Sequence, residues 1–133
     1  MAVRVSDDIQ AELWEKFVFI SALSAACGLA RAPIGAVRDA PLGEELIRRA
    51  VAEVAAVARA RGIALSSSPD RVVERILGLD PALRPSFLLD LERGGPTELD
   101  VLSGTVSRLG AEEGVATPVH DTAWTAFSAA TVA

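Results

Sequence analysis

The stretch "FVFISALSAACGLA", residues 17–30, decides the fold, because it is a long apolar run without a single charged residue. A helix that is apolar on nearly every side must lie in the middle of a bundle or under another subunit. At fourteen residues the run is shorter than the roughly 20 that a membrane-spanning helix needs. The acidic residues Asp7, Asp8, Glu12 and Glu15 precede it, whereas a signal peptide would begin with basic residues. The sequence therefore predicts a buried helix and no membrane span.

The boundaries of this first helix follow from its flanking residues. Ser6 is a suitable N-cap, and Asp7 and Asp8 would then lie in the first turn, where the helix dipole favours acidic side chains. Gly28, or the Arg31-Ala32-Pro33 step, is expected to end the helix. The residues after it, which include Gly35 and Pro41, are expected to form a loop.

The rest of the chain also shows helical periodicity. In "GEELIRRAVAEVAAVARARGIAL", residues 43–65, apolar residues recur every three or four positions, and Gly62 is expected to end that helix. Three further helix starts are marked by capping residues, at Ser68-Pro69, Thr97 and Thr117-Pro118, with ends expected at Gly78 and Gly114 for the first two. Ser86 is predicted to start an additional short helix that Gly94 and Gly95 terminate. Because no segment alternates with period two, the sequence predicts one all-α domain, a multi-helix bundle over residues 1–133.

Composition narrows the kinds of partner. Thirteen basic and eighteen acidic residues give a net charge of −5, and the arginines are scattered, so nucleic acid is not an expected partner. Cys27 is the only cysteine, which excludes an internal disulfide and indicates a reducing, cytoplasmic location. The mean hydropathy of +0.34 is high for a small domain, so apolar surface should remain for a second copy or for another domain.

No dinucleotide-binding glycine motif, phosphate loop, histidine pair at metal spacing or Ser-His-Asp pattern is present. Candidate site residues must therefore be inferred from their positions in the expected helices. Lys16, Ile20 and Ser24 follow one another at spacings of four and so share one stripe of the first helix. Lys16 could equally mark the solvated end of a buried helix, and Ser24 could be a small packing residue.

Ser86 and Glu98 both stand at expected helix starts, where serine caps and acidic residues are stabilising without any functional role. His120, the single histidine, is expected to be an exposed polar residue near the start of the last helix rather than a catalytic one. Gly104 lies inside a helix at a cost of about 1 kcal/mol relative to alanine. We expect a close helix crossing at Gly104 to offset that cost.

Taken jointly, the segments "LWEKFVFISALSA", "AEVAAVARARGIAL", "PSFLLDLERGGPTELDVLSGTVSRLG" and "EEGVATPVHDT" resemble, in order and spacing, the C-terminal domain of ketopantoate reductases (2-dehydropantoate 2-reductases). The resemblance covers about residues 6–128. It implies a helical domain of the 6-phosphogluconate dehydrogenase C-terminal type that closes the substrate cleft of an NADPH-dependent enzyme of pantothenate biosynthesis. It also implies that the N-terminal Rossmann domain, which binds NADPH in that family, is absent, so "MAVRVSDDI" looks like a domain junction.

The resemblance assigns roles to particular residues. The family's catalytic lysine falls on Lys16, which would act as general acid on a 2-keto acid. The substrate-binding serine falls on Ser86 and the motif glutamate on Glu98, and Ser24 stands at a further substrate-facing position. No metal is implied, and the chain alone is expected to bind no NADPH.

Three positions depart from the family pattern. Ile20, Ser24 and Ser103 stand where asparagines are common, so the cleft should be more apolar and ketopantoate is in doubt as the substrate. Two hypotheses follow: the substrate-binding domain of a 2-keto acid reductase that is inactive without a Rossmann partner, or a stand-alone helical dimerisation or interaction module without catalysis. A homodimer fits either hypothesis.

Overall fold

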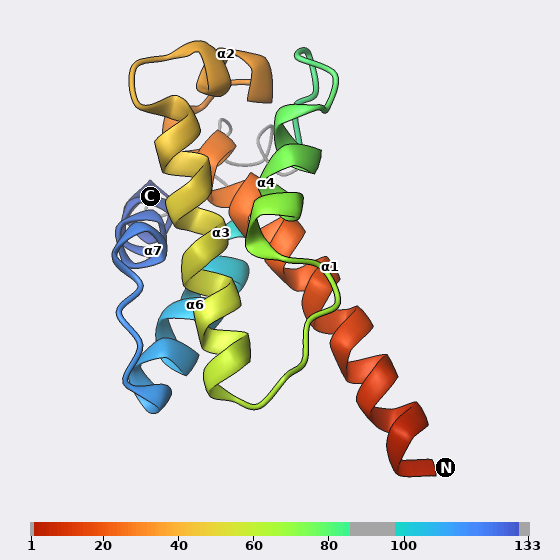
Figure 1. Cartoon of the computed structure of the whole chain (residues 1–133). Coiled ribbons are helices and arrows are strands. Elements are labelled where there is room, and N and C mark those ends of the chain that lie inside the picture. Colours follow the sequence, from red (N-terminus) through yellow and green to blue (C-terminus); the bar gives the residue numbers. More distant parts are fainter. Residues whose placement is uncertain (1, 86–97, 131–133) are drawn as a thin grey trace.

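The computed structural model describes residues 2–85 and 98–130, with side chains for residues 9–85 and 101–130. Six helices lie in these ranges: α1 (Ala2–Ala30), α2 (Ile34–Asp39), α3 (Gly43–Ala60), α4 (Pro69–Leu77), α6 (Glu98–Glu113) and α7 (Pro118–Ala130). No strand occurs in the described part of the chain, so the predicted all-α bundle is confirmed. Figure 1 shows α1 crossing the molecule, with the other helices packed along its C-terminal half.

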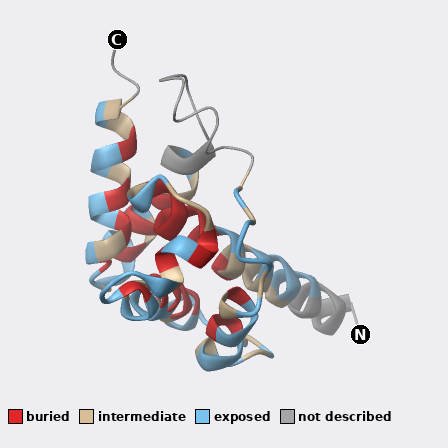
Figure 2. Ribbon diagram, turned by 90° about the horizontal axis from the view of Figure 1, so that it is seen from above, coloured by how far each residue is buried: buried red, intermediate tan, exposed pale blue. Residues whose placement is uncertain are grey.

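The C-terminal half of α1 is the centre of the bundle. Every residue from Ser21 to Gly28 is buried, and α1 contacts α2, α3, α4, α6 and α7. Figure 2 shows the buried residues gathered in the middle of the molecule. The stretch Ile9–Ala30 is long and apolar enough to span a membrane by length and composition alone, but half of it is buried inside the bundle. The predicted buried helix is therefore confirmed.

The two ends of α1 were predicted with different success. The helix ends at the expected step, where Arg31 adopts a left-handed φ of 51° and the Ala32 N–H donates to the Cys27 carbonyl at 3.2 Å. The predicted start at Ser6 is wrong, because α1 begins at Ala2 and Ser6 lies inside it. A good capping residue favours a helix start, but it does not prevent the preceding residues from joining the helix.

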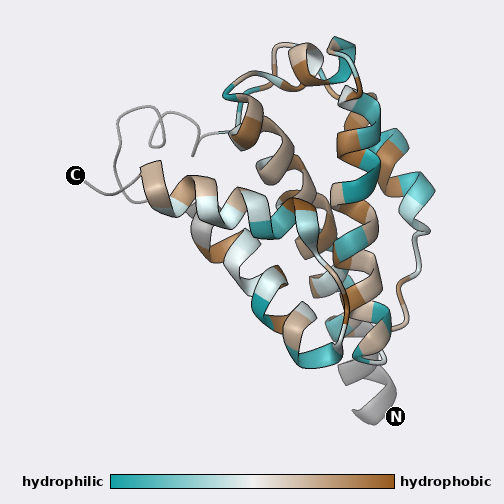
Figure 3. Cartoon of the chain, turned by 90° about the vertical axis from the view of Figure 1, so that its left-hand side faces the viewer, coloured by the Kyte–Doolittle hydropathy of each residue, from teal (hydrophilic) through white to brown (hydrophobic). Residues whose placement is uncertain are grey.

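Helix α3 packs along α1 through the apolar stripe that its sequence predicts. The buried members of that stripe are Ile47, Ala50, Val51, Val54, Val57 and Ala58, while Arg48, Arg49 and Arg59 are exposed on the outer side. Figure 3 shows the same division by hydropathy, with hydrophobic and hydrophilic residues both present along most helices. Gly62, with a φ of +80°, follows the helix as predicted.

The capping signals mark most of the other helix boundaries correctly. Ser68 precedes α4, and its hydroxyl accepts a hydrogen bond from the Arg71 N–H at 3.3 Å. Pro69 and Pro118 are the first residues of α4 and α7. Helix α6 ends one residue before Gly114. The predicted caps Ser86 and Thr97 lie outside the described residues.

Helix α2 was not predicted, since the sequence analysis expected a loop there. Its burial explains its formation, because Ile34 and Val37 both lie in the core. The Ile34 N–H donates to the Leu83 carbonyl at 3.0 Å, and the Gly35 N–H donates to the Pro81 carbonyl at 2.9 Å. These bonds to a distant segment satisfy the first N–H groups of a helix too short to be stable by itself.

Gly104 lies at the predicted close crossing. A Cβ atom at this position would be 2.9 Å from Cε2 and Nε1 of Trp124, which is closer than carbon atoms pack. The Trp124 side chain of α7 therefore packs directly against the backbone of α6 at Gly104.

Candidate functional site

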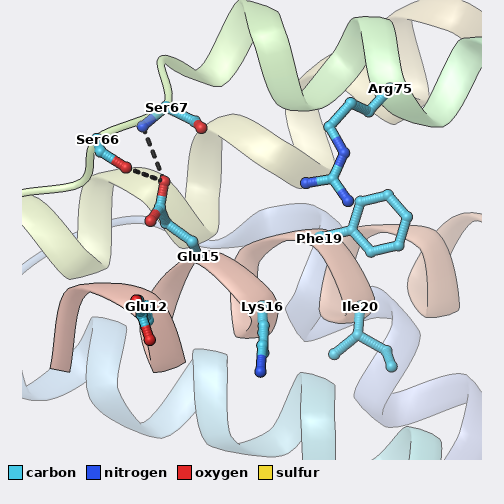
Figure 4. A pocket seen from close by; sticks show the side chains of 8 residues that line it. All are labelled: Glu12, Glu15, Lys16, Phe19, Ile20, Ser66, Ser67 and Arg75. Atoms are coloured by element: carbon cyan, nitrogen blue, oxygen red, sulfur yellow. Dashed lines mark hydrogen bonds between the residues drawn. The ribbon is translucent and has the colours of Figure 1, made fainter. Parts of the chain in front are cut away.

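A groove lies between α1, α4 and the connection between α3 and α4. Its volume is about 560 Å³, within the range of small-molecule sites. The lining residues are Glu12, Glu15, Lys16, Phe19, Ile20, Ser66, Ser67 and Arg75. Figure 4 shows these side chains. The groove combines charged, hydroxyl and apolar groups from three segments of the chain.

Lys16 lies in this groove with its side chain exposed. Figure 4 shows Glu12, Lys16 and Ile20 in a row on the same side of α1, as their spacing of four predicts. Ile20 is 47% exposed. An ammonium donor therefore stands one helical turn from an exposed aliphatic side chain.

Glu15 joins α1 to the opposite wall of the groove. Its Oε1 atom accepts hydrogen bonds from the Ser66 hydroxyl at 2.7 Å and from the Ser67 N–H at 2.8 Å. The hydrogen bond from Ser66 is the main cause of a lowered pKa at Glu15. The residue thus stays ionised and fixes the α3–α4 connection beside Lys16. Sequence reasoning missed this contact, because nothing local links positions 15 and 66.

Arg75 reaches the groove from α4. Its guanidinium carbon lies 4.6 Å from the centroid of the Phe19 ring, a cation–π arrangement. No ion pair of Arg75 is found within the residues whose side chains the structure describes. Stacking on an aromatic ring leaves the N–H groups at the edge of a guanidinium available for an anion. The groove therefore has cationic groups on α1 and on α4.

The other predicted site residues have different outcomes. Ser24 is fully buried, does not line the groove, and its hydroxyl has no hydrogen-bond partner in the described structure. Ser86 lies outside the described residues. Glu98 is the first residue of α6, but its side chain lies outside the described part. The expectation from the family resemblance that Lys16 and Glu98 serve one substrate site therefore stays a prediction.

The expectation that His120 is exposed is wrong, because its side chain is completely buried. Its Nε2 atom lies 3.0 Å from the Ala50 carbonyl, and its Nδ1 atom lies 3.3 Å from the Ser103 hydroxyl. Because a carbonyl can only accept, Nε2 carries the proton and Nδ1 accepts from Ser103. Burial lowers the pKa of His120. The ring is a neutral connector between α3, α6 and α7.

Glu53 lies beside this histidine and is also buried, with 8% of its surface exposed. Its two carboxylate oxygens accept from the Val119 N–H at 2.8 Å and the His120 N–H at 3.0 Å. These N–H groups belong to the first turn of α7, so a carboxylate of α3 acts as the cap at the start of α7. Burial raises the pKa of Glu53. Both groups hold the bundle together, and neither lines the groove.

The remaining metal-ligating and nucleophilic groups suggest no second site. No cluster of three or more His, Cys, Asp or Glu side chains suited to a metal ion is found among the described residues. Cys27 is buried, and burial raises the pKa of its thiol to about 11. A thiol of this kind is a poor nucleophile.

The family of the chain is shown by comparison with known proteins. A family model described as "Ketopantoate reductase PanE/ApbA C terminal" matches residues 8–131. The chain belongs to the ketopantoate reductase C-terminal domain family. The 2-dehydropantoate 2-reductase of Pyrobaculum aerophilum is 31% identical over 118 residues, which are 89% of this chain and 42% of that protein. This chain thus spans less than half the length of that relative.

Two solved structures of similar fold extend the comparison. A PanE/ApbA family ketopantoate reductase from Ralstonia eutropha JMP134 matches with a TM-score of 0.83 and 27% identity, covering 92% of this chain and 41% of its own. A D-mandelate dehydrogenase in complex with NADH matches with a TM-score of 0.80 and 25% identity, over 92% of this chain and 42% of that one. Both neighbours are oxidoreductases, and this chain is similar to less than half of each.

Proposed function

We propose that this chain is the substrate-binding helical domain of an NADPH-dependent oxidoreductase that reduces a 2-keto acid to a 2-hydroxy acid. The observation that carries this proposal is the exposed Lys16 ammonium in a groove of about 560 Å³ in a ketopantoate reductase-family domain. The chain lacks a dinucleotide-binding glycine motif, and no strand occurs among its described residues. A nucleotide-binding domain must therefore come from elsewhere, and the chain by itself is expected to be inactive.

Lys16 is the general acid in this proposal. A bound NADPH would supply a hydride to the carbonyl carbon of the substrate. Nζ of Lys16 would then donate a proton to the oxygen on which negative charge develops, giving the hydroxyl of the product. Water would restore the proton on the lysine. Because Lys16 is exposed in this chain, a covering domain is needed to exclude water from that step.

Ser86 and Glu98 are proposed to contact the substrate. A serine hydroxyl and free N–H groups at a helix start suit the substrate carboxylate. A carboxylate from the start of α6 could accept from the hydroxyl that forms at C2 of the substrate and keep the Lys16 ammonium charged. The single cysteine of the chain supports a cytoplasmic location in this proposal.

A second function, a dimerisation or interaction module without catalysis, is favoured by a separate feature. An apolar groove of about 290 Å³ lies between α1 and α6, lined by Leu13, Trp14, Phe17, Thr105 and Leu109. Leu13 is 59% exposed. Apolar surface of this kind is commonly covered by a second copy or another domain.

Fusion to a nucleotide-binding domain tests the catalytic proposal. The chain would be fused behind the N-terminal part of the Pyrobaculum reductase, and NADPH oxidation would be followed with a panel of 2-keto acids. We expect turnover with at least one acid and a loss of about 100-fold or more in kcat in Lys16→Ala. Because Lys16 is exposed, the variant should keep the unfolding midpoint of the parent. A folded fusion that binds NADPH but reduces no acid would favour the interaction module.

A further inference from the structure

Ile20 is an exposed aliphatic side chain in the one groove that also contains Lys16. The large hydrophobic residues exposed in the described part are Ile9, Leu13, Ile20, Leu42 and Val101. Only Ile20 among them lines the Lys16 groove. Single exposed hydrophobic residues are common on protein surfaces, so exposure alone carries no argument. What matters is the position of Ile20 beside Lys16, the candidate proton donor.

The spacing of the two side chains matches the size of a small keto acid. Residues four apart on a helix have Cβ atoms about 5–6 Å apart, and Figure 4 shows Lys16 and Ile20 on the same side of α1. In a 2-keto acid whose carbonyl oxygen contacts Nζ of Lys16, the substituents on C3 are two bonds away from the carbonyl carbon C2. The substituent can therefore reach the neighbouring position of the row, where Ile20 stands.

We propose, on the basis of the function proposed above, that Ile20 selects 2-keto acids whose C3 and C4 substituents are apolar and carry no hydroxyl group. An aliphatic neighbour gains contact area with a methyl group. A hydroxyl at the same place loses water and finds no donor or acceptor on Ile20.

The polar groups nearest along the groove do not replace that missing partner. Glu15 already accepts from Ser66 and Ser67. Glu12 precedes Lys16 in the row, on the side away from Ile20 (Figure 4). Arg75 lies over the ring of Phe19, and the N–H groups at the edge of its guanidinium suit the substrate carboxylate. The surroundings of Ile20 thus favour an aliphatic or branched substituent.

The expected discrimination is moderate. Small differences in a hydrophobic pocket change selectivity by about 10- to 200-fold. Because Ile20 is half exposed, we expect the lower end of this range, about 10-fold. Ile20→Asn would supply both a donor and an acceptor and should remove or reverse the preference.

Two acids that differ by one hydroxyl test the inference: ketopantoate (4-hydroxy-3,3-dimethyl-2-oxobutanoate) and 3,3-dimethyl-2-oxobutanoate. Each would be titrated into the full chain with 13C-labelled isoleucine methyl groups, and kcat/KM would be measured for both acids in the fusion enzyme described above. We expect the hydroxyl-free acid to be preferred about 10-fold, with the Ile20 methyl signal shifting. Ile9→Asn is the matched control, since Ile9 is on the same helix, is 51% exposed and does not line the groove. It should keep the parent's preference.

The outcomes separate the inference from the function on which it rests. Equal reduction of both acids by the parent, or a preference that Ile20→Asn leaves unchanged, would overturn the role of Ile20 while the keto acid reductase stands. If neither acid shifts an isoleucine signal and the folded fusion reduces no keto acid, both proposals fail. Retained unfolding midpoints in the two asparagine variants would exclude loss of fold as the cause.

Discussion

The carboxylate of Glu53 should be one of the most important polar groups for the stability of this bundle. It is a buried side chain of α3 whose two oxygens accept from the Val119 and His120 N–H groups at 2.8 and 3.0 Å. Pro118, the first residue of α7, has no N–H to offer. Glu53→Ala would therefore leave the next two N–H groups of the helix without their acceptor and α7 without a negative charge at its positive end.

The magnitude follows from these contacts. A hydrogen bond to a charged group contributes about 1.5–3 kcal/mol, and leaving a buried donor unsatisfied costs about 1–3 kcal/mol. Burial of the carboxylate, which raises its pKa, offsets part of this gain. We therefore expect Glu53→Ala to lower the free energy of unfolding by about 2–4 kcal/mol. Glu53→Gln, whose amide keeps one acceptor oxygen, should lose roughly half as much.

Urea unfolding followed by tryptophan fluorescence is a suitable assay, because Trp124 lies on α7 and Trp14 on α1. Glu74→Ala is the control, since Glu74 is exposed on α4 and its loss should change stability by no more than about 0.5 kcal/mol. A Glu53→Ala protein within about 0.5 kcal/mol of the parent would refute the capping argument.

Two further predictions concern the same end of the molecule. Burial lowers the pKa of His120 below its ordinary value of 6.5, so the unfolded chain binds a proton more readily than the folded chain. The contribution of the neutral ring to stability is therefore complete above pH 6.5. It is lost as the pH falls below 6.5. The Tm of the parent should therefore drop between pH 7.5 and 5.5 by more than that of His120→Gln, and parallel curves would contradict this assignment. Gly104→Ala should lower the free energy of unfolding by about 1–2 kcal/mol despite the better helix propensity of alanine, because the new methyl group would collide with Trp124. Chemical denaturation measures this change in the free energy of unfolding. A variant more stable than the parent would show that α6 and α7 can move apart without cost.

Local signals in the sequence predicted much of the helical framework. The ends after Ala60 and Glu113 follow from Gly62 and Gly114, which adopt positive φ angles of 80° and 71°. The start of α4 follows from Ser68, which caps its first turn. Such boundaries are readable in advance, because the physical cause lies within a few residues of the boundary itself.

Part of the candidate site was readable in the same way. The row of Lys16 and Ile20 depends only on helical spacing, and Figure 4 shows both on one side of α1. The opposite wall was not readable, because Ser66 and Arg75 reach Glu15 and Phe19 from segments about fifty residues later in the chain. The local sequence around Ser66 and Arg75 contains no pattern that predicts such contacts.

The amino-acid sequence by itself thus determined the helical class, the burial of most of residues 17–30, most helix boundaries and the membership of the ketopantoate reductase family. Tertiary structure alone decided which polar residues are buried and what they contact. His120 and Glu53 look like ordinary surface residues in the sequence, but the packing of α7 against α3 buries both and makes them partners. The short α2 exists for the same reason, since its first N–H groups are satisfied by carbonyls of residues 81 and 83. Helix propensity and capping act over one or two turns, whereas burial depends on which distant segments come together.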